Sequence, residues 1–141
     1  MTLYFEDFHK GQIIDCGTRA VTKEEVFEFA GEFDPQPHHL DEDAAKSSML
    51  GGLSASGWHV CAMAWRLACD GLLLKSANRG GSRVAETRWI KPVRPGDVLR
   101  LEIEIIDLTT SPKSPGLGFV KMEWRLFTGT GQVGLMIVTP R

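Results

Sequence analysis

The sequence lacks several features that would mark other classes of protein. No apolar run reaches the roughly 18–20 uncharged residues of a membrane-spanning helix. The N-terminal segment MTLYFEDFHKG has acidic residues where a signal peptide has an apolar stretch. The 16 lysines and arginines are scattered and the net charge is −2, so no concentrated basic face is available for nucleic acid. These absences predict a cytoplasmic protein with neither membrane nor nucleic acid as a partner.

Cysteine is also scarce. Cys16, Cys61 and Cys69 form an odd set without a CxxC pair, and we expect them to be reduced, buried thiols. The 141 residues are 43% hydrophobic and 24% charged, as in ordinary globular proteins. We therefore expect a single domain over residues 1–141, with a core that needs neither metal nor disulfide.

The first half of the chain favours helices. Residues 4–15 predict an initial strand or turn that ends near Gly11. The segment VTKEEVFEFAGEF then predicts a helix that Thr22 caps, with Glu25 completing a capping box. Its apolar residues share one face: Val26, Phe29, Ala30 and Phe33. Pro35 should end this helix, because a proline disfavours helical geometry in the residue before it.

A second, longer helix is expected at residues 58–75, after a short acidic turn in which Asp41 starts one or two helical turns. The segment WHVCAMAWRLACDGLLLK is apolar on nearly every side, which is typical of a central buried helix. Trp58 and Trp65 share a face of it and are expected in core or dimer packing.

The second half favours strands, at residues 82–93, 98–110, 119–128 and 133–140. In LRLEIEIID, apolar and charged residues alternate, as expected for an antiparallel sheet with one solvated face. Trp89 and Trp124 are expected to pack within this sheet. One buried helix wrapped by a curved antiparallel sheet gives an α+β domain.

The segment EFDPQPHHLDEDAA carries the candidate chemistry. Asp34 and His39 can share acid–base work if a bend brings them together, and Pro35 and Pro37 stiffen the chain between them. Simpler interpretations remain open: Asp34 as the start of a turn, and His39 as a hydrogen-bonded core residue. A metal site using His38, His39, Asp41 and Asp43 matches no common ligand spacing.

Asp34, Gln36, Pro37 and His39 resemble the Asp-x-Asn-Pro-x-His signature of the MaoC-like dehydratases, the (R)-specific enoyl-CoA hydratase family. The small-residue loop GGLSASG before the long helix and the later segment RWIKPVRPGDVLRLEIEI are also similar to that family, in the same order. The resemblance covers roughly residues 10–140.

The resemblance implies a hot-dog fold and a homodimer, or a higher homo-oligomer, that takes an acyl thioester of CoA or of acyl carrier protein. Asp34 and His39 would be the catalytic residues that hold water for addition across the 2,3 double bond. Backbone N–H groups of Ser56 and Gly57 would bind the thioester oxygen, and Gln36 and Pro37 would support the pair. No metal and no separate cofactor is implied, since CoA is part of the substrate.

Three positions depart from the family pattern: Gln36 replaces Asn, His38 replaces an apolar residue, and Ser56 replaces a frequent histidine. Two alternatives therefore stay open. One is a hot-dog acyl-CoA thioesterase using a carboxylate such as Asp70, and the other is a non-catalytic acyl-CoA binding protein.

Overall fold

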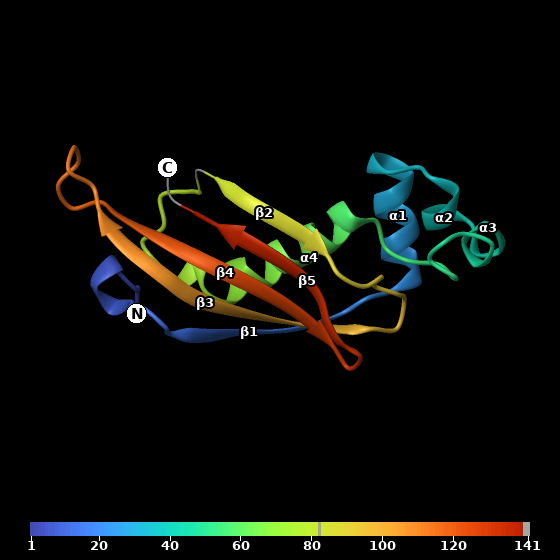
Figure 1. The fold of residues 1–141 in the computed structure, drawn as a ribbon, viewed down its shortest axis with the longest axis horizontal. Helices are drawn as coiled ribbons and strands as arrows, with labels where there is room; N and C mark the ends of the chain where they lie inside the picture. Colours follow the sequence, from blue (N-terminus) through green and yellow to red (C-terminus); the bar gives the residue numbers. More distant parts are fainter. Residues whose placement is uncertain (82, 140–141) are drawn as a thin grey trace.

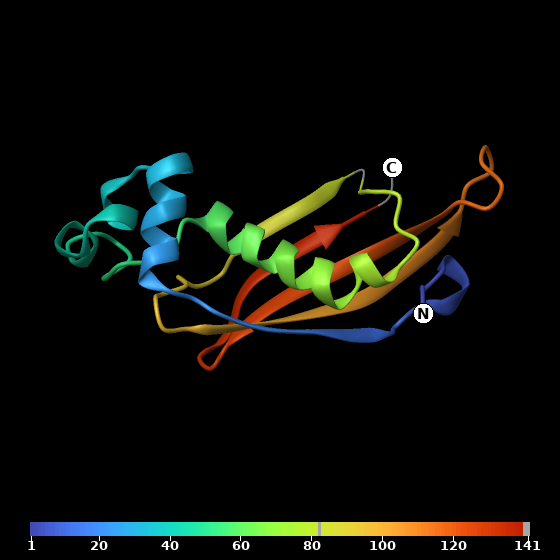
Figure 2. The ribbon, with the colours of Figure 1, turned by 180° about the vertical axis from the view of Figure 1, so that it is seen from behind.

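The structure is a computed structural model that describes residues 1–81 and 83–139. Five antiparallel strands form one sheet in the order β1-β3-β4-β5-β2, and the long helix α4 lies across one face of it (Figures 1 and 2). The strands are β1 Ile13–Ala20, β2 Val84–Trp89, β3 Val98–Thr110, β4 Gly118–Thr128 and β5 Gly131–Val138. This is the α+β, hot-dog arrangement that the sequence predicts.

The helices fall into two groups. Helix α4, Gly57–Gly71, runs along the sheet, whereas three shorter helices gather beyond its N-terminal end (Figures 1 and 2). These are α1 Lys23–Phe33, α2 Pro37–Leu40 and α3 Glu42–Lys46. In the described residues, no helix is both long and apolar enough to cross a membrane.

Strand β3 confirms the predicted alternation from Leu99 to Ile105, after which its register with β4 shifts. Its inward side chains are completely buried: Leu99, Leu101, Ile103 and Ile105. On the other face Arg125 of β4 pairs with Glu102 at 2.9 Å and with Glu104 at 3.1 Å. The apolar face therefore supplies the core under α4, while the charged face stays partly solvated.

Helix α4 differs from its prediction in extent and in burial. It ends at Gly71, and residues 73–75 form a separate 3₁₀ turn. A Cβ at Gly71 would lie 2.6 Å from the backbone of Cys16, so the chain approaches β1 too closely here for a larger residue. Trp58 is 63% exposed and Trp65 38% exposed, so one face of α4 is open in the single chain. The predicted burial on nearly every side is therefore wrong for the isolated subunit.

Strand β1 was not predicted as a strand, and a bulge explains why. The register with β3 shifts between Asp15 and Thr18, and Gly17 adopts a φ of +86° at that point. A bulge breaks the alternation on which strand prediction depends. The preceding residues Phe5–Asp7 form a 3₁₀ turn, which is the turn alternative of the prediction for residues 4–15.

The end of α1 follows the prediction, whereas its beginning follows it only in part. The Thr22 hydroxyl accepts from the Glu25 backbone N–H at 3.2 Å. The Glu25 side chain pairs with Arg19 at 2.9 Å rather than completing a capping box. Among the strand predictions, positions 82 and 140 lie outside the described residues.

The three cysteines are free thiols. Cys16 is buried, and burial raises the pKa of its thiol to about 11, while Cys61 and Cys69 are only half-buried. Cys16 therefore stays a neutral packing residue at physiological pH.

Candidate active site

A bend between α1 and α2 brings Asp34 and His39 together. Helix α1 ends at Phe33, and Asp34 leaves helical geometry with φ −149° and ψ 67° before Pro35. Pro37 then occupies the first position of α2, which carries His39. As a result, Oδ2 of Asp34 lies 3.5 Å from Nε2 of His39. The predicted convergence is confirmed, and the catalytic role of the two residues remains a prediction.

The orientation of the His39 ring is fixed by a backbone carbonyl. Its Nδ1 lies 2.8 Å from the carbonyl oxygen of Ser54, and the residue is only 6% exposed. A carbonyl oxygen only accepts, so Nδ1 must carry the hydrogen. In the neutral ring, Nε2 then presents its lone pair toward the carboxylate of Asp34.

Two side chains donate to the carboxylate of Asp34. The Ser56 hydroxyl donates to Oδ2 at 2.6 Å, and the Gln36 amide donates to Oδ1 at 2.6 Å. These hydrogen bonds, Ser56 first and Gln36 second, lower the pKa of Asp34, and the nearby His39 and His38 act in the same direction. Asp34 is therefore held as a carboxylate across the neutral pH range. The sequence placed Gln36 beside the pair but did not indicate the hydroxyl contact of Ser56.

The N-terminus of α4 lies beside the pair and is not capped by a side chain among the described residues. Ser56 is the N-cap residue, yet its hydroxyl bonds Asp34 and not a backbone N–H of its own helix. The N–H groups of the first turn therefore lack the usual acceptor from the N-cap side chain. Such a helix start favours a negatively charged oxygen.

Gly57 permits a close approach of Trp89 at this helix start. The Trp89 indole N–H donates to the Gly57 carbonyl at 2.7 Å. A Cβ on Gly57 would lie 2.7 Å from the indole ring, so a side chain here would displace the tryptophan. Trp89 is 46% exposed and packs edge-on against Trp58. Trp89 lies in a strand as predicted and pairs with Gly134 of β5, but its ring lies at the sheet edge over the start of α4.

Arg94 holds the loop that leads into α4, and no sequence pattern indicated this role. Its guanidinium donates to the carbonyls of Leu50 and Leu53, the second at 3.3 Å. Its own N–H donates to the Asp97 side chain at 2.9 Å. The loop continues to Ser54, whose carbonyl oxygen bonds Nδ1 of His39. By fixing this loop, Arg94 indirectly helps to fix the orientation of the His39 ring.

Asp70, the alternative carboxylate, lies in the last turn of α4. It is paired with Arg66 at 2.9 Å and half of its side chain is exposed. Asp34 and His39 are far more enclosed, with side-chain exposures of 15% and 7%. An exposed, ion-paired carboxylate is a weak general base, so the geometry favours the Asp34–His39 pair as the site.

These features define a hot-dog protein in which Asp34 and His39 face each other at the start of the central helix. Comparison with known proteins agrees: residues 8–115 match the family model described as MaoC like domain. The chain therefore belongs to the MaoC-like domain family.

Individual relatives fit this assignment. The chain is 35% identical to a MaoC-like dehydratase from Rhodospirillum rubrum, with a TM-score of 0.84 over 99% of this chain and 98% of the other. It is 32% identical to the uncharacterized protein YdeM of Bacillus subtilis over 82% of this chain and 80% of that protein. The (R)-hydratase PhaJ1 from Pseudomonas aeruginosa shares the fold, with a TM-score of 0.71 and 24% identity over 97% and 85% of the two chains.

Proposed function

We propose that the protein is a hydro-lyase that adds water across the 2,3 double bond of an enoyl thioester, or removes it from the 3-hydroxyacyl product. The thioester is carried by CoA or by acyl carrier protein, and the enzyme needs no metal or further cofactor. Membership of the MaoC-like family supports hydratase chemistry in general. The observation that carries the proposal is the 3.5 Å separation of Asp34 Oδ2 and His39 Nε2.

Both of these atoms are acceptors when the ring is neutral. His39 uses its only hydrogen on the Ser54 carbonyl, and Asp34 is held ionised by Ser56 and Gln36. Two acceptors that face each other repel unless a donor lies between or beside them. A water molecule has two hydrogens and can donate one to each, so the pair suits a water as its ligand.

The chemistry follows from which group can hold a proton. His39 Nε2 takes a proton from the water while the water oxygen forms a bond to C3 of the enoyl group. The C2–C3 π electrons move onto the thioester and give an enolate. Nε2 then returns the proton to C2, which completes addition from one face. Asp34 orients the water and stabilises the transient imidazolium, because a carboxyl with a lowered pKa is a poor proton donor at neutral pH.

The enolate oxygen needs donors that are in place before the reaction. The N–H groups at Ser56 and Gly57 supply them at the uncapped start of α4. Their distance from the acid–base pair is fixed by the hydrogen bond between Ser56 and Asp34. One short segment thus positions the water and binds the developing charge.

We propose further that the working form is a cytoplasmic homodimer. Strand β2 is an edge of the sheet, and large apolar side chains are exposed on it and next to it: Trp58, Val84, Trp89 and Ile90. A free edge with this much apolar surface favours pairing with another chain. A second copy of β2 is the partner that covers both features.

Purified protein mixed with trans-2-butenoyl-CoA tests the function directly. We expect loss of the ultraviolet absorbance of the conjugated thioester, with 3-hydroxybutanoyl-CoA as the product by mass spectrometry. A thiol reagent added in parallel detects free CoA, which a thioesterase would release and a hydratase would not. Thermal stabilisation by acyl-CoA without any product would identify a binding protein and contradict the proposal.

A further inference from the structure

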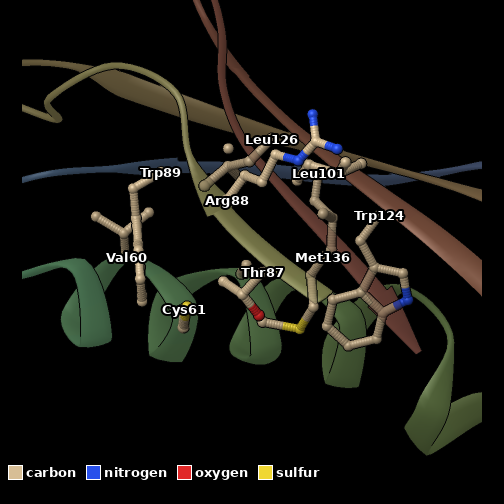
Figure 3. Close-up of a pocket in the computed structure, with 12 residues that line it drawn as sticks. Val60, Cys61, Thr87, Arg88, Trp89, Leu101, Trp124, Leu126 and Met136 are labelled. Atoms are coloured by element: carbon tan, nitrogen blue, oxygen red, sulfur yellow. The ribbon is translucent and has the colours of Figure 1, made fainter. Parts of the chain in front are cut away.

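A narrow apolar slot begins one helical turn beyond the site. It lies between α4 and the strands β2, β4 and β5, with a cavity volume of about 20 Å³ (Figure 3). The side chains that set its shape are Val60, Cys61, Ala64, Trp89, Trp124 and Met136. Figure 3 shows Trp89 at one end of the slot and Trp124 at the other, with Cys61 and Met136 between them.

Direct contacts connect the slot with the start of α4. Trp89 lines the slot and also donates to the carbonyl of Gly57. Val60, which lines it from the helix side, donates its backbone N–H to the carbonyl of Ser56 at 3.0 Å. An acyl chain whose thioester oxygen is bound at Ser56 and Gly57 would therefore have this apolar slot one helical turn further along α4.

Trp124 closes the slot at its far end. The residue is 1% exposed, and its ring lies 5.0 Å from that of Trp65. A second hollow of about 770 Å³ lies beyond it, around the C-terminal end of α4, and Trp124 lines that hollow as well. The indole nitrogen points away from Met136, and it has no hydrogen-bond partner among the described residues (Figure 3). Trp124 thus separates a very small space from a large one.

We propose that Trp124 sets the chain length of the substrate and restricts the enzyme to short acyl groups of about four carbons. This inference rests on the proposed function. Carbons 1 to 3 of an enoyl thioester occupy the catalytic centre, so carbon 4 and its successors must enter the slot. A volume of about 20 Å³ holds about one water-sized group, which is enough for a terminal methyl and not for a longer chain.

The test compares chain lengths in the intact protein and in two variants. We expect kcat/KM for trans-2-butenoyl-CoA to exceed that for trans-2-octenoyl-CoA by about 100-fold or more, since single misplaced methylenes cost about 10–200-fold. Trp124→Leu joins the slot to the large hollow and should lower this ratio at least tenfold. Trp124→Phe is a smaller change and should also lower the ratio of the two kcat/KM values. It provides the test if the leucine variant does not fold. Leu73→Ala is the matched control, because Leu73 lines the larger hollow and not the slot, and its ratio should stay near that of the wild type.

Calorimetry with the saturated esters butanoyl-CoA and octanoyl-CoA separates this inference from the hydratase proposal. If no enoyl ester is hydrated but butanoyl-CoA still binds better than octanoyl-CoA, the reaction is wrong and the chain-length inference holds. If octenoyl-CoA is hydrated as well as butenoyl-CoA, or if both folded Trp124 variants keep the wild-type ratio, the inference is overturned while hydration stands. Failure of both saturated esters to bind also overturns it.

Discussion

The Ser56 hydroxyl lies 2.6 Å from Oδ2 of Asp34, although the two residues are 22 positions apart in the chain. This single contact fastens the start of the central helix to the bend that carries Asp34 and His39. It uses the hydroxyl that would ordinarily cap α4, which leaves the N–H groups of the first turn free for a ligand. This hydrogen bond is also the largest cause of the lowered pKa of Asp34.

Replacing Ser56 by Ala should raise the pKa of Asp34 and shift the pH dependence of the enzyme. If ionised Asp34 is required, activity falls as pH falls through its pKa, so in Ser56→Ala the fall should begin at a higher pH. A kcat/KM profile across the acid range measures this. Ser76→Ala removes a hydroxyl near the other end of α4 and should leave the profile unchanged. If kcat/KM falls at the same pH in Ser56→Ala and in the wild type, the ionisation of Asp34 does not control the rate.

The same variant should change the pH dependence of stability. The pKa of Asp34 is lower in the folded protein than in the unfolded chain, where it is about 3.9. Its contribution is therefore present above that value and is lost as pH falls through the folded-state pKa. Ser56→Ala should reduce stability at neutral pH more than at acid pH, and urea unfolding at several pH values measures the difference.

Arg94 should act as a positioning residue for His39. Arg94→Leu leaves the carbonyls of Leu50 and Leu53 without their donor, which should cost about 1–3 kcal/mol in the free energy of unfolding. We expect kcat to fall about tenfold or more while KM changes little, because the loop that holds the ring loosens. Arg94→Lys keeps the charge but lacks the planar guanidinium group that reaches both carbonyls, so its kcat should lie between those of the wild type and Arg94→Leu. Restoration of activity by added guanidinium would support the role, and wild-type kcat in Arg94→Leu would contradict it.

Gly57 should tolerate no side chain. Gly57→Ala pushes a methyl group into the Trp89 indole and should cost about 1–3 kcal/mol in stability, with loss of activity because the helix start moves. Gly31→Ala is the matched control, since nothing lies within 4 Å of the added methyl group in α1. That helical substitution should stabilise the protein by roughly 0.5–1 kcal/mol. Thermal or urea unfolding of both variants tests the contrast, and equal effects would refute it.

The free edge of β2 should be the dimer contact. We expect the wild type to sediment at twice the mass of one chain. Val84→Lys places a charge on this edge and should raise the dissociation constant at least 100-fold, because edge lysines oppose strand pairing. Val98→Lys, at an exposed position of β3, should leave the protein dimeric. A monomeric wild type, or a dimeric Val84→Lys variant, would place the contact elsewhere.

Local patterns predicted much of this fold, and their failures have identifiable causes. The alternation from Leu99 to Ile105 located β3, because a strand with one buried face leaves a period of two in the sequence. In β1, the bulge at Gly17 interrupts this alternation, so the strand could not be recognised from the sequence. The open face of α4 was missed because Trp58 and Trp65 are apolar whether they contact the chain's own core or another surface.

Residue spacing predicted the site only where its residues are close in sequence, and the family resemblance added Ser56 and Gly57. Asp34, Gln36 and His39 form one short motif, so their proximity followed from two prolines and a helix end. Trp89 and Arg94 reach the site from the region of β2, and only the tertiary fold brings them there. No sequence pattern around Trp89 or Arg94 indicates these contacts.

The rate of hydration of trans-2-butenoyl-CoA in Asp34→Asn and His39→Gln tests the central claim most directly. Each substitution keeps the approximate size of the side chain. Asp34→Asn replaces one carboxylate oxygen by an NH2 group that only donates, and His39→Gln removes the ring nitrogen that accepts and returns the proton. We predict that kcat/KM falls by about 100-fold or more in each variant, with the fold and the mass of the assembly unchanged. Hydration at nearly the wild-type rate in either variant would contradict the account, because that acceptor would then not serve the reaction.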